Sequence, residues 1–217
     1  MKRPAIVSLG AFPDIKTMAL LSQQPDTLIE IHDNYLKQTY RNRYRIAGST
    51  GAIELSIPVK FSQSNRAYDQ VTIDYRNHWN RTHWRTLTAT YNNSPYFNYY
   101  CDAYQELFKT PVATLMEFNL KALGLLCKDF GLKMPSTTDQ WAKPADFNEE
   151  DLRDWIHTKS FDHFETPEYF QVFSDRFGFI HGCSALDLLF CMGPDARFYL
   201  MDFDLPSKGD IKTFIED

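Results

Sequence analysis

The hydrophobic residues of this 217-residue chain follow one spacing before about residue 75 and another after it. In most of the first part, apart from residues 15–21, they alternate with polar residues, as in residues 53–57, which is the period of a strand with one buried face. In the second part they recur every three or four positions, as in residues 111–130, which is the period of an amphipathic helix. This change of period predicts an α+β fold, in which a small N-terminal sheet packs against a larger helical portion.

The expected sheet is mixed and has four or five strands. Residues 40–46 and 53–57 both alternate and flank a turn at residues 48–51, so they predict a hairpin. An amphipathic segment from Ile15 to Leu21 predicts a helix between the first two strands. The other expected strands cover residues 5–9, 27–31 and 71–73, and the other expected helices cover residues 78–91, 99–108 and 111–130.

Length and composition predict one globular domain. Domains commonly contain roughly 100–200 residues, and the 43% of hydrophobic residues suffices for a core. We therefore expect residues 1–217 to form a single domain. Within it, the polar, proline-containing residues 134–150 show no periodicity and predict a surface connection.

The net charge of −5 is the sum of two parts of opposite sign. Residues 1–143 carry 17 basic and 12 acidic side chains, whereas residues 144–217 carry 6 and 16. A negative net charge disfavours binding to nucleic acid or to an anionic membrane. Residues 37–85, with nine basic and three acidic side chains, are the region suited to a compact anion.

Lys37, Arg41 and Arg43 are the candidate anion-binding residues. If residues 37–45 form a strand, alternation places these three side chains and Arg45 on one face, opposite Asn42. Guanidinium groups bind phosphate and carboxylate through two parallel hydrogen bonds. The alternative is a solvated strand face whose arginines pair with the acidic C-terminal third.

His83 is the candidate catalytic residue. Trp79, His83, Leu87 and Tyr91 lie four positions apart and share one face of the expected helix. An imidazole between aromatic groups is partly desolvated and titrates near neutral pH, as a general base requires. The alternative is a hydrogen-bonded histidine of the core. The sequence has no HExxH or HxxxH pair, which disfavours a zinc enzyme, and we expect no bound metal.

The bend at residues 182–184 has two interpretations. It could expose Cys183 as the nucleophile of a cysteine hydrolase, with His181 or His163 as its partner. Alternatively, Ser184 and Asp187 fit the S-x-x-D arrangement that caps a helix, here the apolar run at residues 185–190. We favour the helix cap.

Several well-known site motifs are missing from the sequence. It contains no GxGxxG after a strand, no GxxxxGK[ST] and no GxSxG, so we expect no cofactor. The four cysteines form no CxxC pair, which favours a reducing, cytoplasmic setting. The apolar stretch at residues 5–12 is short for a secretion signal, and the uncharged apolar runs are too short for a membrane span.

The order of several short blocks resembles the WbqC-like protein family, from near the N-terminus to about Asp202. The earlier blocks are Phe12-Pro13, Lys37-Gln38 with Arg41-Asn42-Arg43, Leu55-Ser56-Ile57-Pro58-Val59, Trp79 with His83 and Tyr91, and Ser94-Pro95-Tyr96-Phe97. The later blocks are Tyr169-Phe170-Gln171, Phe177-Gly178-Phe179, Ser184 to Phe190, and Gly193-Pro194. The chain departs from the family pattern at residues 182–183 and at residues 8–11.

The resemblance implies a role in surface-polysaccharide or O-antigen assembly. In that setting we expect a transferase that moves an acyl or aminoacyl group to a sugar or a sugar nucleotide, a small-molecule substrate. In the expected site, His83 is the base. The anion clamp consists of Lys37, Arg41 and Arg43. The groups that position the substrate are Asn42, Trp79, Tyr91 and Tyr96. The alternative is a non-catalytic binding or assembly protein that forms a homodimer through its oppositely charged parts.

Overall fold

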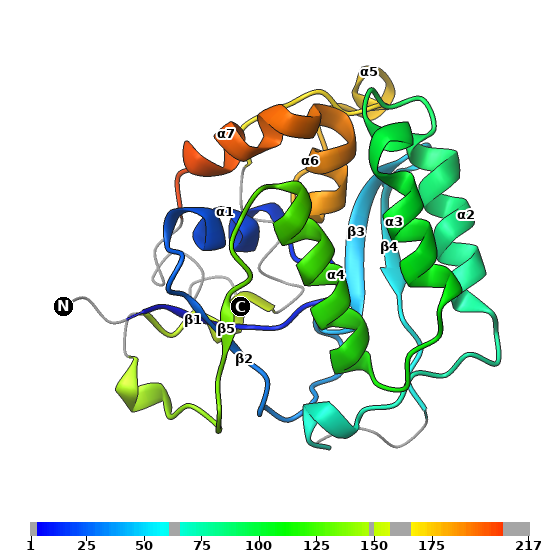
Figure 1. The fold of residues 1–217 in the computed structure, drawn as a ribbon. Coiled ribbons are helices and arrows are strands. Elements are labelled where there is room, and N and C mark those ends of the chain that lie inside the picture. The colour runs from blue at the N-terminus through cyan, green and yellow to red at the C-terminus, as the bar shows by residue number, and fades with distance from the viewer. Residues whose placement is uncertain (1–3, 61–65, 148–149, 157–165, 206–217) are drawn as a thin grey trace.

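The computed structural model describes residues 4–60, 66–147, 150–156 and 166–205. Its architecture is α+β, as predicted (Figure 1). The strands are β1 (Ile6–Ser8), β2 (Leu28–Glu30), β3 (Arg43–Gly48), β4 (Gly51–Ser56) and β5 (Ser136–Thr137). The helices are α1 (Ile15–Gln23), α2 (Trp79–Tyr91), α3 (Phe97–Lys109), α4 (Leu115–Asp129), α5 (Ser174–Phe177), α6 (Ala185–Met192) and α7 (Ala196–Met201).

Strands β1, β2 and β5 form a parallel sheet in that order. The helix predicted after the first strand is present as α1, which connects β1 to β2. On the side of β1 away from β2, Ile6 forms a further parallel bridge with Asp151. Strand β1 therefore lies between β2 and the segment around Asp151.

The predicted hairpin is confirmed in β3 and β4, which pair antiparallel from Arg43↔Ser56 to Gly48↔Gly51. Gly51 has a φ of +96°, a conformation that glycine adopts without steric cost. Tyr44 and Ile46 are buried on the inner face, and α4 lies beside the hairpin in Figure 1. The alternation in the sequence thus identified both the strands and their buried face.

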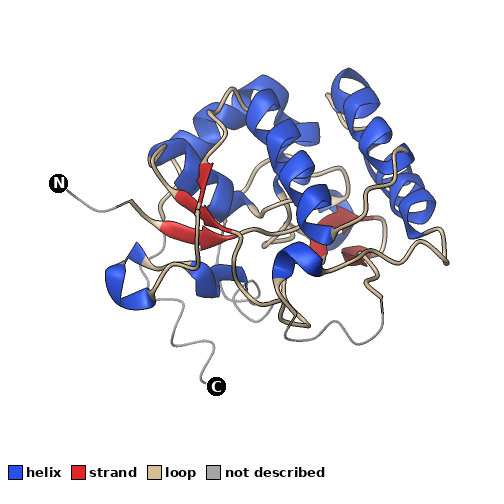
Figure 2. Cartoon of the chain, turned by 60° about the horizontal axis from the view of Figure 1, so that its bottom comes forward, coloured by secondary structure: helices blue, strands red, loops and turns tan. Residues whose placement is uncertain are grey.

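The expected single sheet of four or five strands is replaced by two separate sheets, which Figure 2 shows as two groups of strands. Residues 71–73 form isolated bridges, Thr72↔Thr114 and Val59↔Ile73, rather than a strand. Strand β5 comes instead from the segment predicted to be a surface connection. A strand of two residues is too short to show an alternating pattern, which explains why the sequence did not indicate it.

Phe12, in the loop between β1 and α1, has a φ of +44°, which is uncommon for an aromatic residue. Its ring is buried in an aromatic cluster, 4.8 Å from the ring of Tyr44 and 5.8 Å from those of Phe108 and Phe118. Packing of this size offsets the backbone strain and fixes the course of the loop. The loop is consequently held between the parallel sheet and the hairpin.

Across the described ranges, no helix combines the length and apolar character needed to cross a membrane.

Candidate functional site

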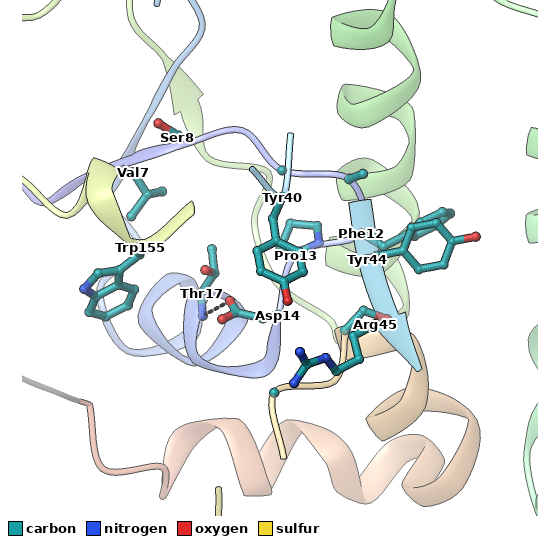
Figure 3. Close-up of a pocket in the computed structure, with 14 residues that line it drawn as sticks. Val7, Ser8, Phe12, Pro13, Asp14, Thr17, Tyr40, Tyr44, Arg45 and Trp155 are labelled. Atoms are coloured by element: carbon teal, nitrogen blue, oxygen red, sulfur yellow. Dashed lines mark hydrogen bonds between the residues drawn. The ribbon is translucent and has the colours of Figure 1, made fainter. Parts of the chain in front are cut away.

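A pocket opens beside the carboxyl end of β1, next to the N-terminus of α1 (Figure 3). Its cavity volume is only about 20 Å³, and the space around it opens to solvent. The lining comes from four separate parts of the chain: Val7, Ser8, Gly10, Ala11, Phe12, Pro13, Asp14 and Thr17; Tyr40, Tyr44 and Arg45; Trp155; and Gly182 and Ser184. The pocket is therefore a product of the tertiary fold rather than of one motif.

The position of this pocket follows from the strand order. After β1 the chain passes to β2 on one side, whereas the segment at Asp151 pairs with the other side of β1. Ligands of parallel sheets commonly bind outside the carboxyl ends of the strands, where the chain connections diverge. Ser8, at the end of β1, and Trp155, which follows the Asp151 bridge, line the pocket at this point.

Asp14 fixes the wall formed by α1. Its Oδ1 accepts a hydrogen bond of 2.9 Å from the backbone N–H of Thr17, which caps the helix. Its Oδ2 lies 3.0 Å from Nζ of Lys16, and both side chains are buried. The negative charge of Asp14 is thus balanced by a neighbouring cation within the wall of the pocket.

Arg45 and Tyr40 form the opposite wall. Figure 3 shows both side chains directed toward Asp14, whereas the hydroxyl end of Tyr44 points away from the pocket. Nη2 of Arg45 lies 3.1 Å from Oε1 of Glu54, the residue opposite it on β4. The guanidinium of Arg45 and the phenol of Tyr40 therefore face the side of the pocket that holds the Asp14 carboxylate.

A group of polar residues lies beside the pocket, and all of them except Asp33 are buried. We call this group the carboxyl-end cluster: Ser8, Glu30, Asp33, Arg41 and Arg153. Arg41 donates from Nη2 to Oδ2 of Asp33 (2.8 Å) and to Oγ of Ser8 (3.1 Å). Arg153 reaches Oε2 of Glu30 at 3.5 Å from Nη1. Since Ser8 belongs to both sites, it connects this cluster to the pocket.

The predicted anion clamp is not assembled as one row. Strand β3 begins at Arg43, and residues 37–42 lie mostly in turns outside any strand, so alternation does not extend back to Lys37 or Arg41. Arg41 is buried against Asp33, Arg43 lies 4.0 Å from Glu54, and Lys37 is exposed. Arg41 and Arg43 therefore have acidic partners in the N-terminal part of the chain.

Asn42 joins the turn to the end of the hairpin. Its Nδ2 donates a hydrogen bond of 3.0 Å to the carbonyl of Ile57, and its own carbonyl accepts one of 2.7 Å from the N–H of Ile57. Both interactions hold the chain together at this corner.

His83 is buried, with 4% of its surface exposed, and does not line the pocket. Its Nδ1 lies 3.0 Å from the hydroxyl of Tyr44, and its ring packs edge-on against that of Trp79. Burial lowers the pKa of His83 to about 4, and a hydrogen bond with the Ser56 backbone opposes the shift. The imidazole is therefore neutral at pH 7 and is separated from the pocket by Tyr44.

Tyr91 is the last residue of α2, Tyr96 directly precedes α3, and both lie near α6. The Tyr91 hydroxyl donates a hydrogen bond of 2.6 Å to Oδ1 of Asp187, and the half-buried ring of Tyr96 lies against Gly193. The residues predicted to form one site are thus distributed among the carboxyl-end cluster, the aromatic core and this contact with α6.

Asp187 does not form the predicted helix cap with Ser184. Its carboxylate turns into the core, where Oδ2 accepts hydrogen bonds from Tyr169 (2.5 Å) and Gln171 (2.9 Å). The side chain of Ser184 makes no capping hydrogen bond, although its backbone does begin α6. The pattern thus predicted the start of the helix but not the role of either side chain, because three donors in the core bind the carboxylate.

Cys183 is buried, and burial raises the pKa of its thiol well above the usual range. His181, one of its proposed partners, instead accepts a hydrogen bond at Nδ1 from the backbone N–H of Thr166 (3.0 Å). His163, the other, lies outside the described residues. These features argue against a thiolate nucleophile at this bend.

The sequence identified Phe12, Pro13, Arg45 and Ser184 as parts of patterns, but it did not place them in one site. Asp14, Thr17 and Trp155 carried no signal beyond their local helical or aromatic character. Within the part of the chain that the structure describes, no group of three or more His, Cys, Asp or Glu side chains is arranged to hold a metal ion.

The model of the WbqC-like protein family matches residues 21–157. Over 229 aligned positions the chain is 24% identical to the "Uncharacterized protein Rv1507c" of Mycobacterium tuberculosis (strain ATCC 25618 / H37Rv). The alignment covers 92% of this chain and 98% of that protein. No solved structure matches the chain significantly.

Proposed function

Because the chain belongs to the WbqC-like protein family, we propose that it transfers an acyl or aminoacyl group to a sugar or a sugar nucleotide in surface-polysaccharide assembly. The pocket beside β1 binds the sugar. The family membership supports the polysaccharide setting, and the lining of the pocket supports the proposed location of the site. No cofactor is part of the proposal.

The observation that carries this proposal is the composition of the pocket at the carboxyl end of the parallel sheet. Trp155 and Tyr40 supply aromatic surface suited to the apolar face of a sugar ring. Ser8, Thr17 and Asp14 supply hydroxyl and carboxylate groups suited to sugar hydroxyls. This combination of aromatic surface and short polar side chains favours a carbohydrate over an apolar ligand.

The predicted role of His83 changes within this proposal. A general base must reach the proton that it removes, but Tyr44 separates His83 from the pocket. His83 therefore acts as a positioning residue that holds Tyr44 by its hydroxyl. Arg41 has a similar role toward Ser8, through the hydrogen bond of 3.1 Å between them.

Thermal unfolding in the presence of nucleotide sugars, free amino sugars and acyl thioesters tests the proposal. A ligand at 100 times its Kd stabilises the folded state by about 2.7 kcal/mol. We expect a sugar-containing compound to stabilise the wild-type protein and to lose this effect in Thr17→Trp, which fills the pocket from α1. Ser22→Trp, on the same helix outside the pocket lining, is the matched control. If no sugar compound stabilises the wild type, the proposal is wrong.

A second candidate, a non-catalytic assembly protein, is favoured by exposed apolar side chains on α7. Phe198 and Met201 lie one turn apart and are 63% and 52% exposed. Such residues commonly mark a contact with another protein chain. Sedimentation at low and high salt tests this candidate, since a dimer held by the oppositely charged parts weakens as salt screens them, whereas an apolar dimer persists.

A further inference from the structure

A surface groove runs beside α2 and α3, apart from the pocket beside β1. Its first part, of about 480 Å³, lies between the start of α2 and the end of α3, two helices that stand side by side in Figure 1. Its second part, of about 580 Å³, continues along residues 73–76 to Lys60. Tyr75 lines both parts, and neither part shares a lining residue with the pocket. Each part alone has the size of a site for a drug-sized ligand, about 300–1,000 Å³, so the whole groove accommodates several linked rings.

Positive charge dominates the lining of this groove. Arg81 on α2 and Lys109 at the end of α3 form no ion pair within the described residues, and Lys109 donates only to the amide oxygen of Gln105, at 2.8 Å. Among the described lining residues, Asp74 is the one acidic side chain, and its two oxygens lie 3.0 and 2.9 Å from Nε of Arg76. Because Asp74 already has its own cation, Arg81 and Lys109 leave the groove attractive to an anion.

Two half-buried aromatic rings, Trp84 and Tyr75, lie in the same lining. The Trp84 ring is held by the rings of Phe97 and Phe108, at centroid distances of 5.9 and 6.1 Å. The Tyr75 hydroxyl accepts a hydrogen bond of 3.1 Å from the N–H of Val112. Aromatic surface of this kind packs against the apolar face of a sugar ring. Since both rings are fixed in the free protein, such packing costs little conformational entropy.

The start of α2 adds a partial positive charge to the groove. His78 is the N-cap of this 13-residue helix, its side chain makes no capping hydrogen bond, and the first turn contains no acidic residue. Asn80, in that turn, donates a hydrogen bond of 2.8 Å to the carbonyl of Phe108 and so ties the helix start to α3. Helix N-termini favour negative charge. This helix end therefore supplements the charges of Arg81 and Lys109.

We propose that the surface groove binds a short acidic oligosaccharide, whose sugar rings pack on Trp84 and Tyr75 and whose carboxylates pair with Arg81 and Lys109. Guanidinium groups bind carboxylates through two parallel hydrogen bonds. A single phosphate or nucleotide would occupy only one part of the groove, and the net charge of −5 disfavours a long nucleic acid. This inference rests on the proposed function for its polysaccharide setting, but it concerns a site apart from the pocket.

Calorimetric titration with short chains of known charge tests the class of ligand. The acidic probes are trigalacturonate and a hyaluronan tetrasaccharide, the neutral probe is maltotriose, and the nucleic-acid probe is a short oligothymidylate. We expect an acidic probe to bind the wild-type protein about tenfold more tightly than maltotriose or the oligothymidylate, since it alone offers both carboxylates and sugar rings. No binding of either acidic probe, or equally tight binding of maltotriose or the oligothymidylate, would overturn the proposal.

Arg81→Leu tests the location of this binding. The variant should weaken the affinity for the acidic probe about tenfold, because the charge and its paired hydrogen bonds are lost. Arg85→Leu is the matched control, since Arg85 lies one turn later on α2, is also exposed and lines neither part of the groove. It should change the affinity less than about twofold. Equal affinities in the wild type and Arg81→Leu would show that the acidic probe binds elsewhere.

Thr17→Trp, in the pocket, separates this site from the proposed function. It should leave the affinity for the acidic probe unchanged, and Arg81→Leu should leave the stabilisation by a sugar nucleotide unchanged. If the acidic probe binds through Arg81 but no sugar compound stabilises the protein, the proposed function fails while the groove stands. If sugar compounds act at the pocket but the acidic probe is insensitive to Arg81, the groove fails while the proposed function stands.

Discussion

Asp14 and Ser184 pair across an antiparallel bridge that joins the start of α1 to the start of α6. The N–H of Ala185 strengthens this junction by donating a hydrogen bond of 2.9 Å to the carbonyl of Pro13. The loop after β1 is therefore held against a helix that lies about 170 residues later in the chain. This junction builds the pocket, and several of its consequences are measurable.

Replacing Asp14 by alanine should destabilise the fold. The change removes the cap of α1 and the carboxylate beside the buried Lys16, and breaking a buried ion pair costs about 3 kcal/mol. Urea unfolding measures the loss. The double variant Asp14→Ala with Lys16→Met should recover part of it, because the buried charge is then removed as well. A double variant that is less stable by the sum of both single losses would contradict the pairing.

Stability should fall as the pH is lowered from about 6.5 to about 4 because of His83. The pKa of His83 is about 4 in the folded protein and about 6.5 when unfolded, so the unfolded state binds the proton first and is favoured by acid. The shift corresponds to roughly 3 kcal/mol, at about 1.4 kcal/mol per pKa unit. Urea midpoints measured between pH 4 and 7.5 test this.

His83→Gln is the matching variant, since glutamine does not titrate and can still bind the Tyr44 hydroxyl. Its stability should depend less steeply on pH over the same range. An identical pH dependence in the variant and the wild type would show that other groups cause the loss.

Removing the Tyr91 hydroxyl should weaken the anchorage of α6. This hydroxyl donates a hydrogen bond of 2.6 Å to the buried carboxylate of Asp187. Hydrogen bonds to charged groups contribute about 1.5–3 kcal/mol to stability. Tyr91→Phe should therefore lower the free energy of unfolding by that amount. Tyr96→Phe is the control on a half-buried ring and should change stability by less than about 0.5 kcal/mol. Equal losses in both variants would contradict a specific role for the Asp187 contact.

Cys183 should react slowly with iodoacetamide at neutral pH while the protein is folded. The thiol is buried and its pKa is raised by burial, so little thiolate is present or accessible. Mass spectrometry of labelled peptides measures the rate, and denaturant should accelerate it greatly. Rapid labelling of Cys183 in the folded protein would restore the cysteine-hydrolase interpretation.

Local patterns predicted the elements of the fold better than they predicted the site. The hairpin and α2 follow from the spacing of residues close in the sequence, and both are present. Strand β5 and the separation of the two sheets depend on long-range pairing, as between Leu28 and Ser136, which no local period encodes. His83 was correctly placed on a buried helix face, but the sequence did not show that Tyr44 lies between it and the pocket.

The basic residues between 37 and 45 show the same limitation for the direction of individual side chains. The expectation of one arginine row assumed a strand through residues 37–45, whereas β3 begins at Arg43. Two positions earlier, Arg41 turns into the carboxyl-end cluster, and two positions later, Arg45 enters the pocket. The position at which the strand starts therefore decided which arginine lines the pocket.

Hydrogen–deuterium exchange in the presence of a stabilising sugar nucleotide tests the location of the site most directly. The proposal predicts slower exchange in peptides that contain residues 8–17 and 182–184, which line the pocket from both sides of the Asp14–Ser184 bridge. Exchange near His78 and Lys109, which line a separate surface groove, should not change. Protection confined to that groove, with unchanged exchange at residues 8–17 and 182–184, would contradict the central claim.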